Sequence, residues 1–320
     1  LIEKGIYHSF YWSFNPNSSD TGGILKDDWT NIHEDKVALL QKLWAAGDDG
    51  TVPDPDPQPD PEPDPEPDPM PSGDRIVVGY FPAWGIYYDF NVKDIDASKI
   101  THINYAFINV VNNEPVVGVT ERGVGDAWAD YQKAVPASLS VDGLGDTWSQ
   151  KLRGNFNQFK KLKEKYPHIK VLAALGGWTW SGGFSDAALP ENREEFVRKV
   201  IDIFIRGNLP YDAASGTGGE GVLAGVFDGI DIDWEYPVCC GLGGNIYRPE
   251  DKQNYTALLA EFRKQLDAID PDLELSIAAP AGPGNIVNFD VAGLIQHVDF
   301  INLMTYDYHG DWDKFTGHLA

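Results

Sequence analysis

The sequence predicts an α/β protein, a (β/α)8 TIM barrel that is C-terminally incomplete, with an N-terminal appendage and a disordered linker. After residue 74, six strand-like segments alternate with amphipathic helices, which is the pattern of parallel β/α units. Carboxylates gather in the fourth segment, and a barrel of this kind places its catalytic groups at strand ends. A doubly wound open sheet is the alternative. It usually has a Gly-rich phosphate loop after its first strand, and G-Y-F-P-A-W-G at 79–85 is not one.

Three regions divide the 320 residues. Residues 51–71 place Pro at nearly every second position with Asp, Glu or Gln between, which forbids helix and sheet alike. Such a segment is an extended spacer of about 3 Å per residue. We therefore assign 1–47 to a remnant, 48–73 to a linker and 74–320 to the barrel.

The predicted elements follow from apolar patterning. The strands are expected at 75–81, 100–107, 170–175, 225–237, 273–279 and 298–304. Helices are expected at 34–44, 148–166, 192–206 and 254–266, each with apolar residues at a spacing of three and four. Because a closed barrel needs two more strands, we expect this chain to be a fragment of a longer multi-modular enzyme.

Composition limits the partners. The formal net charge of −24 argues against nucleic acid and anionic membranes, and it suits a protein that acts on a neutral polymer. We expect no membrane span, no metal, no cofactor and a monomer. The neighbours Cys239 and Cys240 are expected to be two free or occluded thiols, because the ring that joins adjacent cysteines is strained.

The stretch 225–237 carries the chemistry. Alternation along a strand puts Asp231, Asp233 and Glu235 on one side, about 6 to 7 Å apart. Three like charges in a partly dry place cannot all stay ionised, so one carboxyl keeps its proton and can serve as a general acid. A solvated strand would interleave Lys or Arg, and there is none between Gly225 and Pro237.

The ordered pattern D-x-x-D-x-D-x-E, from Asp228 to Glu235, resembles the signature of glycoside hydrolase family 18, the chitinases and their relatives. The resemblance implies a secreted hydrolase that acts on chitin or chito-oligosaccharides by retaining, substrate-assisted catalysis. It implies that Glu235 is the general acid, that Asp233 orients the acetamido group of the sugar, and that Asp231 shares a proton with Asp233. Asp228 would be structural.

Two further runs resemble motifs of the same family. V-L-A-A-L-G-G-W-T-W at 171–180 resembles the S-x-G-G motif, with Gly176 and Gly177 near the sugar. Ala174 stands where that motif has serine, which costs one hydrogen bond beneath the acids. M-T-Y-D-Y-H-G at 304–310 resembles the motif in which Tyr306 holds the acetamido oxygen and Asp307 binds sugar.

Aromatic residues near strand ends complete the predicted substrate site. The remaining predicted substrate-binding residues are Tyr80, Trp84, Phe107, Trp178 and Met304. Flat indole rings suit stacking on sugar faces, whereas core packing and buried loop anchors are the alternatives for single residues.

The N-terminal remnant resembles the last β/α unit of a family 5 glycoside hydrolase, in which Trp12 would stack on sugar in a lost active site. An unrelated aromatic hairpin is the alternative. For the barrel, the alternatives to an endo-acting chitinase are an endo-β-N-acetylglucosaminidase, a non-catalytic chitin-binding lectin and an inactive fragment. Related lectins typically lose the terminal acid, which is present here as Glu235.

Overall fold

The computed structural model describes residues 34–38, 75–310 and 312–317. The chain divides into two compact units, and residues 75–308 belong to one of them. Residues 34–38 are helical, in agreement with the helix expected at 34–44. The rest of that helix, Trp12 and the linker at 48–73 lie outside the described residues.

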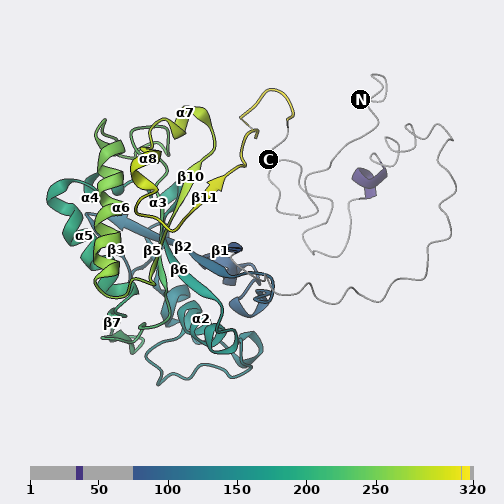
Figure 1. The fold of residues 1–320 in the computed structure, drawn as a ribbon. Coiled ribbons are helices and arrows are strands. Elements are labelled where there is room, and N and C mark those ends of the chain that lie inside the picture. Colours follow the sequence, from purple (N-terminus) through teal and green to yellow (C-terminus); the bar gives the residue numbers. More distant parts are fainter. Residues whose placement is uncertain (1–33, 39–74, 311, 318–320) are drawn as a thin grey trace. The chain divides into compact units, whose positions relative to one another are not determined.

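Six parallel strands form the sheet that positions the site, and their spatial order equals their order along the chain. They are β1 (Val78–Pro82), β2 (His102–Val111), β6 (Lys170–Gly176), β9 (Gly229–Asp233), β10 (Glu274–Pro280) and β11 (Phe300–Met304). The sheet is curled into an open part of a (β/α)8 barrel (Figure 1). The six predicted strands are confirmed, with ends that differ by a few residues.

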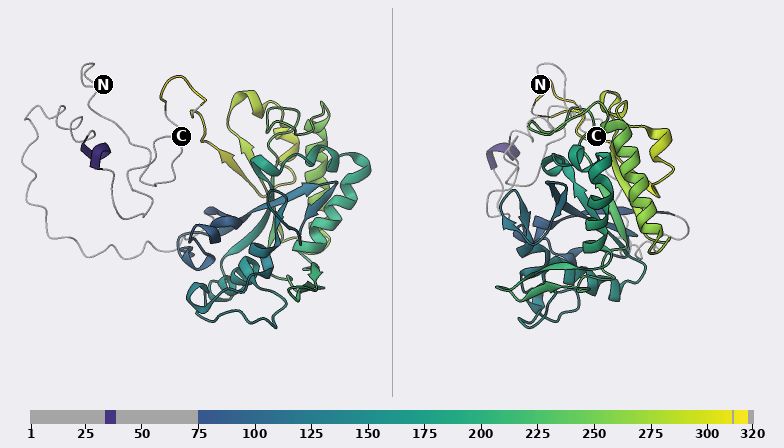
Figure 2. Two further views of the ribbon diagram at one scale, coloured as in Figure 1. Left: turned by 180° about the vertical axis from the view of Figure 1, so that it is seen from behind. Right: turned by 90° about the vertical axis from the view of Figure 1, so that its left-hand side faces the viewer.

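Three long helices lie along the outer side of the curled sheet (Figure 2). They are α2 (Gly154–Lys165), α5 (Pro190–Phe204) and α6 (Asp251–Asp267). Helix α2 begins six residues later than the predicted 148–166. Gly154 has φ +61°, and a Cβ on it would lie 2.6 Å from the carbonyl oxygen of Ala129, so the chain enters the helix through a turn that needs glycine.

The loops between these elements contain shorter strands and helices. Antiparallel pieces are β3 (Glu114–Val116), which pairs with β2, and the pairs β4 (Thr120–Glu121) with β5 (Gly125–Asp126) and β7 (Leu209–Asp212) with β8 (Thr217–Gly219). Short helices are η2 (Ala83–Tyr87), η3 (Val92–Asp94), η4 (Trp128–Gln132), η5 (Ala137–Leu139), α3 (Gly177–Trp180), α4 (Phe184–Ala187), α7 (Pro283–Ile286) and α8 (Val291–Leu294).

Aromatic rings fill the space between the sheet and α2. Tyr105 on β2 is fully buried, and its ring centroid lies 5.1 Å from that of Phe156 and 5.6 Å from that of Phe159. The Tyr105 hydroxyl donates to Asp130 at 2.5 Å. Burial raises the pKa of Asp130 to about 7, so this carboxyl joins the core largely as a neutral acid at acidic pH.

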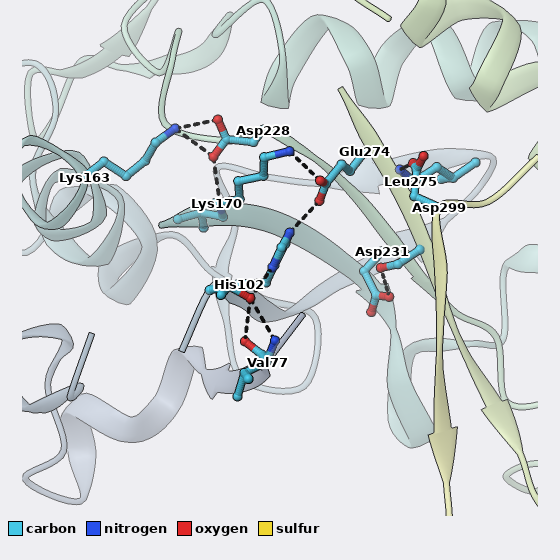
Figure 3. Close-up of polar contacts among 12 residues, drawn as sticks. Val77, His102, Lys163, Lys170, Asp228, Asp231, Glu274, Leu275 and Asp299 are labelled. Atoms are coloured by element: carbon cyan, nitrogen blue, oxygen red, sulfur yellow. Dashed lines mark hydrogen bonds and ion pairs between the residues drawn. The ribbon is translucent and has the colours of Figure 1, made fainter. Parts of the chain in front are cut away.

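A charged cluster ties the strands together near their N-terminal ends (Figure 3). Glu274 on β10 lies 2.8 Å from Nε2 of His102 on β2 and also pairs with Lys170 on β6. Asp228, just before β9, accepts a hydrogen bond from the backbone N–H of Val171 at 2.8 Å and pairs with Lys163 of α2. These contacts join β2, β6, β10, helix α2 and the segment that leads into β9.

We expect the cluster around Glu274 to make stability fall at acid pH. Burial favours the neutral carboxyl, but the hydrogen bonds and charges of His102 and Lys170 outweigh burial and lower the pKa of Glu274. A lowered folded-state pKa contributes stability above the unfolded value of about 4.3, and this contribution is lost as pH falls. Glu274→Gln should lower the melting temperature by roughly 5 °C at pH 7 and by less at pH 3.5.

The control is Glu195→Gln, which breaks an exposed ion pair with Arg198 on α5 and should shift the melting temperature by no more than about 1 °C. An equal loss of melting temperature for Glu274→Gln at both pH values would contradict the assignment.

Candidate active site

Asp231 lies at the buried centre of the site, in the middle of β9. Its side chain is fully buried and accepts hydrogen bonds from three elements. Oδ2 accepts from the Tyr80 hydroxyl of β1 at 2.9 Å, and Oδ1 accepts from Ser276 of β10 at 2.6 Å and from Asn302 of β11 at 3.3 Å. Burial raises the pKa of Asp231 to about 6, although these three donors act to lower it.

Asp233 lies two residues further along β9, on the same side of the strand. Its side chain is 4% exposed, and its Oδ1 atom is buried without a hydrogen-bond partner. Burial, followed by the charges of Glu235 and Asp231, raises the pKa of Asp233 well above its ordinary value. Asp233 therefore holds a proton more readily than an ordinary aspartate and has an oxygen that no protein group satisfies.

Glu235 lies two residues beyond the end of β9 and is 9% exposed. Burial raises its pKa, a hydrogen bond with Tyr236 lowers it and the charge of Asp307 raises it again. Because Asp233 and Glu235 interact as a pair and both have raised pKa values, the pair retains a proton toward neutral pH. The arrangement has the properties required of a general acid.

The backbone around Glu235 is fixed by groups that the sequence did not single out. The Glu235 N–H donates to the hydroxyl of Ser181 at 2.9 Å, and that hydroxyl lies 2.8 Å from the carbonyl oxygen of Gly177 and 3.0 Å from that of Asp233. Ser181 is 1% exposed. Asn245 donates to the carbonyl oxygen of Glu235 at 3.3 Å.

A cleft of about 670 Å³ is lined mainly by residues of β1 and β11, from Ile76 and Val78 at the amino end of β1 to Met304 and Tyr306 at the carboxyl end of β11. Six of the predicted site residues line it: Tyr80, Trp84, Phe107, Asp233, Met304 and Tyr306. Trp84 is 45% exposed and Tyr306 is 53% exposed, so both present faces to solvent. Burial, and then the charges of Asp233 and Glu235, raise the pKa of Tyr306, so its hydroxyl keeps its proton and can donate.

Three other predicted residues, Trp178, Asp307 and Asp228, do not line the cleft. Trp178, in α3, is 48% exposed. Asp307 follows Tyr306 and has φ +57°. Asp228 lies in the charged cluster at the opposite end of β9, so its position fits the structural role predicted for it.

Gly176 and Gly177, in the 171–180 run, are in close contact with other parts of the protein. Gly176 has φ +103°, and a Cβ there would lie 2.2 Å from the carbonyl oxygen of Asp233. Gly177 has φ +73°, and a Cβ there would lie 2.7 Å from the Phe107 ring. The sequence predicted that these glycines let a sugar ring approach the backbone. In the structure, the space that a side chain would need is occupied at Gly176 by the backbone of β9 and at Gly177 by the Phe107 ring.

The expectation of two free thiols is wrong, because Cys239 and Cys240 form a disulfide. Val238 has φ +75° and Cys240 has φ +77°, so the chain turns sharply at this point. Neighbouring side chains point to opposite sides of an extended chain, but a turn lets them meet. The disulfide lies in the loop that follows Glu235.

Neither a metal-ligand cluster nor a membrane-spanning helix occurs within residues 34–38, 75–310 and 312–317. There, no group of three or more His, Cys, Asp or Glu side chains is arranged to hold a metal ion. In the same residues, no helix combines the length and apolar character needed to cross a bilayer.

An open parallel β/α barrel with buried carboxyls on one strand, near an aromatic-lined cleft, has the features that glycoside hydrolases use. The comparisons with known proteins identify the family. The profile of the glycosyl hydrolases family 18 matches residues 76–320, so the chain belongs to this family.

Several chitinases are similar to the chain. Chitinase A1 of Niallia circulans is 38% identical over 274 residues, which cover 76% of this chain and 36% of that protein. Chitinase 63 of Streptomyces plicatus is 34% identical over 318 residues, which cover 98% of this chain and 44% of that protein. The catalytic domain of psychrophilic chitinase B from Arthrobacter TAD20 is 43% identical, with a TM-score of 0.70 over 73% of this chain and 59% of that one. The chain thus spans less than half the length of these two curated relatives.

Proposed function

We propose that the protein carrying this chain is an endo-acting chitinase that hydrolyses β-1,4 linkages between N-acetylglucosamine units. The observation that carries the proposal is the unpartnered Oδ1 of Asp233, which is buried beside the cleft and next to Glu235. A buried acceptor without a donor is costly. The N–H of a 2-acetamido group on the bound sugar would supply that donor.

The mechanism we propose is retaining and substrate-assisted. Glu235 protonates the glycosidic oxygen as the bond to the anomeric carbon breaks. The acetamido oxygen of the same sugar attacks that carbon and forms an oxazolinium ion, which Asp233 stabilises at N–H and Tyr306 at oxygen. Glu235, now deprotonated, takes a proton from a water molecule that attacks the anomeric carbon. The oxazolinium ring opens, the acetamido group is regenerated, and the configuration at the anomeric carbon is retained. The mechanism needs no cofactor.

The cleft residues would bind the rest of the polymer. Trp84 and Trp178 offer exposed indole faces for stacking, and Tyr80, Phe107 and Met304 would line the central subsite. Asp307 would bind a sugar hydroxyl.

The organisation around this domain is also a proposal. We propose that 1–47 is a family 5 remnant, that 48–73 is a linker, and that the complete protein is a secreted, monomeric, multi-modular enzyme. The strongly acidic composition suits a neutral extracellular polymer.

Substrate assistance is tested by removing the acetamido group from the substrate. With the complete protein, chitohexaose should be cleaved internally, and fully deacetylated chitosan hexamer should be cleaved at least about 10³-fold more slowly. Equal rates on the two hexamers would contradict the mechanism.

The alternatives give different products. Release of intact glycans from an N-glycoprotein, without cleavage of chitohexaose, would indicate an endo-β-N-acetylglucosaminidase. Binding of chitohexaose without cleavage would indicate a lectin.

A further inference from the structure

The main chain that carries Glu235 begins where the pairing between β6 and β9 ends. Gly176 of β6 and Asp233 of β9 are the last register partners of these two strands, and after Gly176 the chain turns into α3. The register therefore stops one residue before Trp234. The N–H of Glu235 lies at this open end of the ladder.

A side chain continues the ladder by one residue. In a parallel sheet, a residue bonds to one carbonyl and one N–H of the neighbouring strand, and these two groups lie two residues apart. The Ser181 hydroxyl makes this pair of contacts, because it lies 3.0 Å from the carbonyl oxygen of Asp233 and accepts from the N–H of Glu235 at 2.9 Å. Ser181 thus takes the place of a backbone residue opposite Trp234.

Helix α3 holds Ser181 in this place. Ser181 caps the C-terminal end of α3, and its hydroxyl also lies 2.8 Å from the carbonyl oxygen of Gly177, one helical turn earlier. A hydroxyl has one proton and two lone pairs, so the two carbonyl oxygens share the proton and the Glu235 N–H uses a lone pair. Ser181 is 1% exposed, so bulk water does not compete for these contacts.

We propose that Ser181 is a positioning residue for catalysis, whose hydroxyl fixes the peptide group between Trp234 and Glu235 and thereby aims the Glu235 carboxyl at the glycosidic oxygen. This inference rests on the proposed function, because the aim of Glu235 matters to a rate only if Glu235 protonates a leaving group. The hydroxyl itself touches neither the sugar nor the carboxyl, and it acts through the main chain.

Two other contacts fix the groups on either side of this N–H. The Trp234 ring anchors the segment on the helix side, with its centroid 5.5 Å from that of Phe184 and 5.2 Å from that of Tyr255. Asn245 donates to the carbonyl oxygen of Glu235 at 3.3 Å. The contact with Ser181 holds the N–H that lies between these two anchors.

Ser181→Ala should lower kcat on chitohexaose by about 10- to 10²-fold and leave KM within about twofold of the parent. The substitution leaves a buried N–H without its acceptor, which is costly, so the peptide group shifts and the Glu235 carboxyl moves with it. A displacement of about 1 Å at a catalytic group can cost about 10²-fold in rate. The residues that line the cleft are unchanged, which is why KM should change little.

The leaving group separates a misplaced acid from a general loss of structure. Protonation helps a sugar alcohol to leave much more than it helps p-nitrophenolate, which is stable as an anion. Ser181→Ala should therefore lower kcat/KM about 10-fold or more on chitohexaose, but by no more than about threefold on p-nitrophenyl di-N-acetylchitobioside. Equal losses on the two substrates would overturn the proposal.

Ser140→Ala is the matched control. Ser140 is 5% exposed, and its hydroxyl also has three polar partners, Asp142, Gln158 and Lys161, at 2.8, 3.1 and 2.9 Å. Both substitutions remove a buried hydroxyl and should lower the melting temperature by roughly 5 °C, whereas Ser140→Ala should keep kcat within about twofold of the parent. If Ser181→Ala also keeps kcat in that range, Ser181 is merely structural and the proposal fails.

A measurement without substrate separates this inference from the proposed function. Hydrogen exchange of the complete protein, followed at single-residue resolution by mass spectrometry, reports how firmly the Glu235 amide is held. In Ser181→Ala this amide should exchange about 10-fold faster, while the amide of Ile230, buried in the middle of β9, should keep its rate. Unchanged exchange at Glu235 overturns the inference even if the parent cleaves chitin. Faster exchange supports the hold by Ser181 even if the parent does not turn over chitin.

Ser181→Thr tests the hydroxyl itself. The variant keeps the donor and the acceptor, so it should restore the slow exchange of the Glu235 amide and bring kcat to within about threefold of the parent. If the added methyl group disturbs the contact, slow exchange and kcat should be lost together, which supports the proposal. A folded Ser181→Thr protein that protects the Glu235 amide and is still as slow as Ser181→Ala would overturn it.

Discussion

Glu235→Gln will lower kcat on chitohexaose by about 10² to 10⁴-fold and leave the fold intact. The amide keeps the size of the carboxyl, but it has no acidic proton to give to the leaving oxygen. Because Glu235 is 9% exposed and its pKa is raised by burial, the parent carries that proton at a pH where an ordinary glutamate would be ionised. Steady-state kinetics, with a thermal melt of the same preparation, measures both quantities.

The control for this experiment is Glu220→Gln, which changes an exposed glutamate in a loop and should leave kcat within about twofold. Retention of more than a tenth of the parent kcat in a folded Glu235→Gln protein would remove Glu235 as the acid. Binding of chitohexaose should persist in the variant, because the cleft is unchanged.

Gly176→Ala should have the largest effect on stability. Gly176 is the register partner of Asp233, and a Cβ on it would lie 2.2 Å from the Asp233 carbonyl oxygen and 2.6 Å from the Phe184 ring. The residue also has φ +103°, which alanine adopts only under strain. A cost of about 3 kcal/mol or more would lower the melting temperature by about 6 to 12 °C, and displacement of β9 would reduce kcat as well.

Gly282→Ala is the matched substitution for comparison. Gly282 has φ −67°, and a Cβ there would have no neighbour within 4 Å. Its melting temperature should stay within about 1 °C of the parent or rise slightly. If the Gly176→Ala protein has the same melting temperature as the Gly282→Ala protein, the close contact between β6 and β9 does not limit stability.

The sequence by itself determined the type and order of the elements. Strand alternation placed Asp231, Asp233 and Glu235 on one side of one segment, because that relation depends only on the period of two within a strand. The same local reasoning found the six strands and located the three long helices. It erred at the start of α2, where the contact that requires Gly154 comes from Ala129, twenty-five residues earlier.

Only the tertiary structure decided which groups meet. Tyr80 and Asp231 are 151 residues apart and share a hydrogen bond, and Ser276 reaches the same carboxylate from 45 residues away. Such contacts depend on register between strands, which the pattern within a single strand does not encode. For the same reason the sequence could name Ala174 as a missing donor but could not locate the hydroxyl on β10 that contacts Asp231. The turn that joins Cys239 to Cys240 depends on backbone angles that the fold imposes after Glu235.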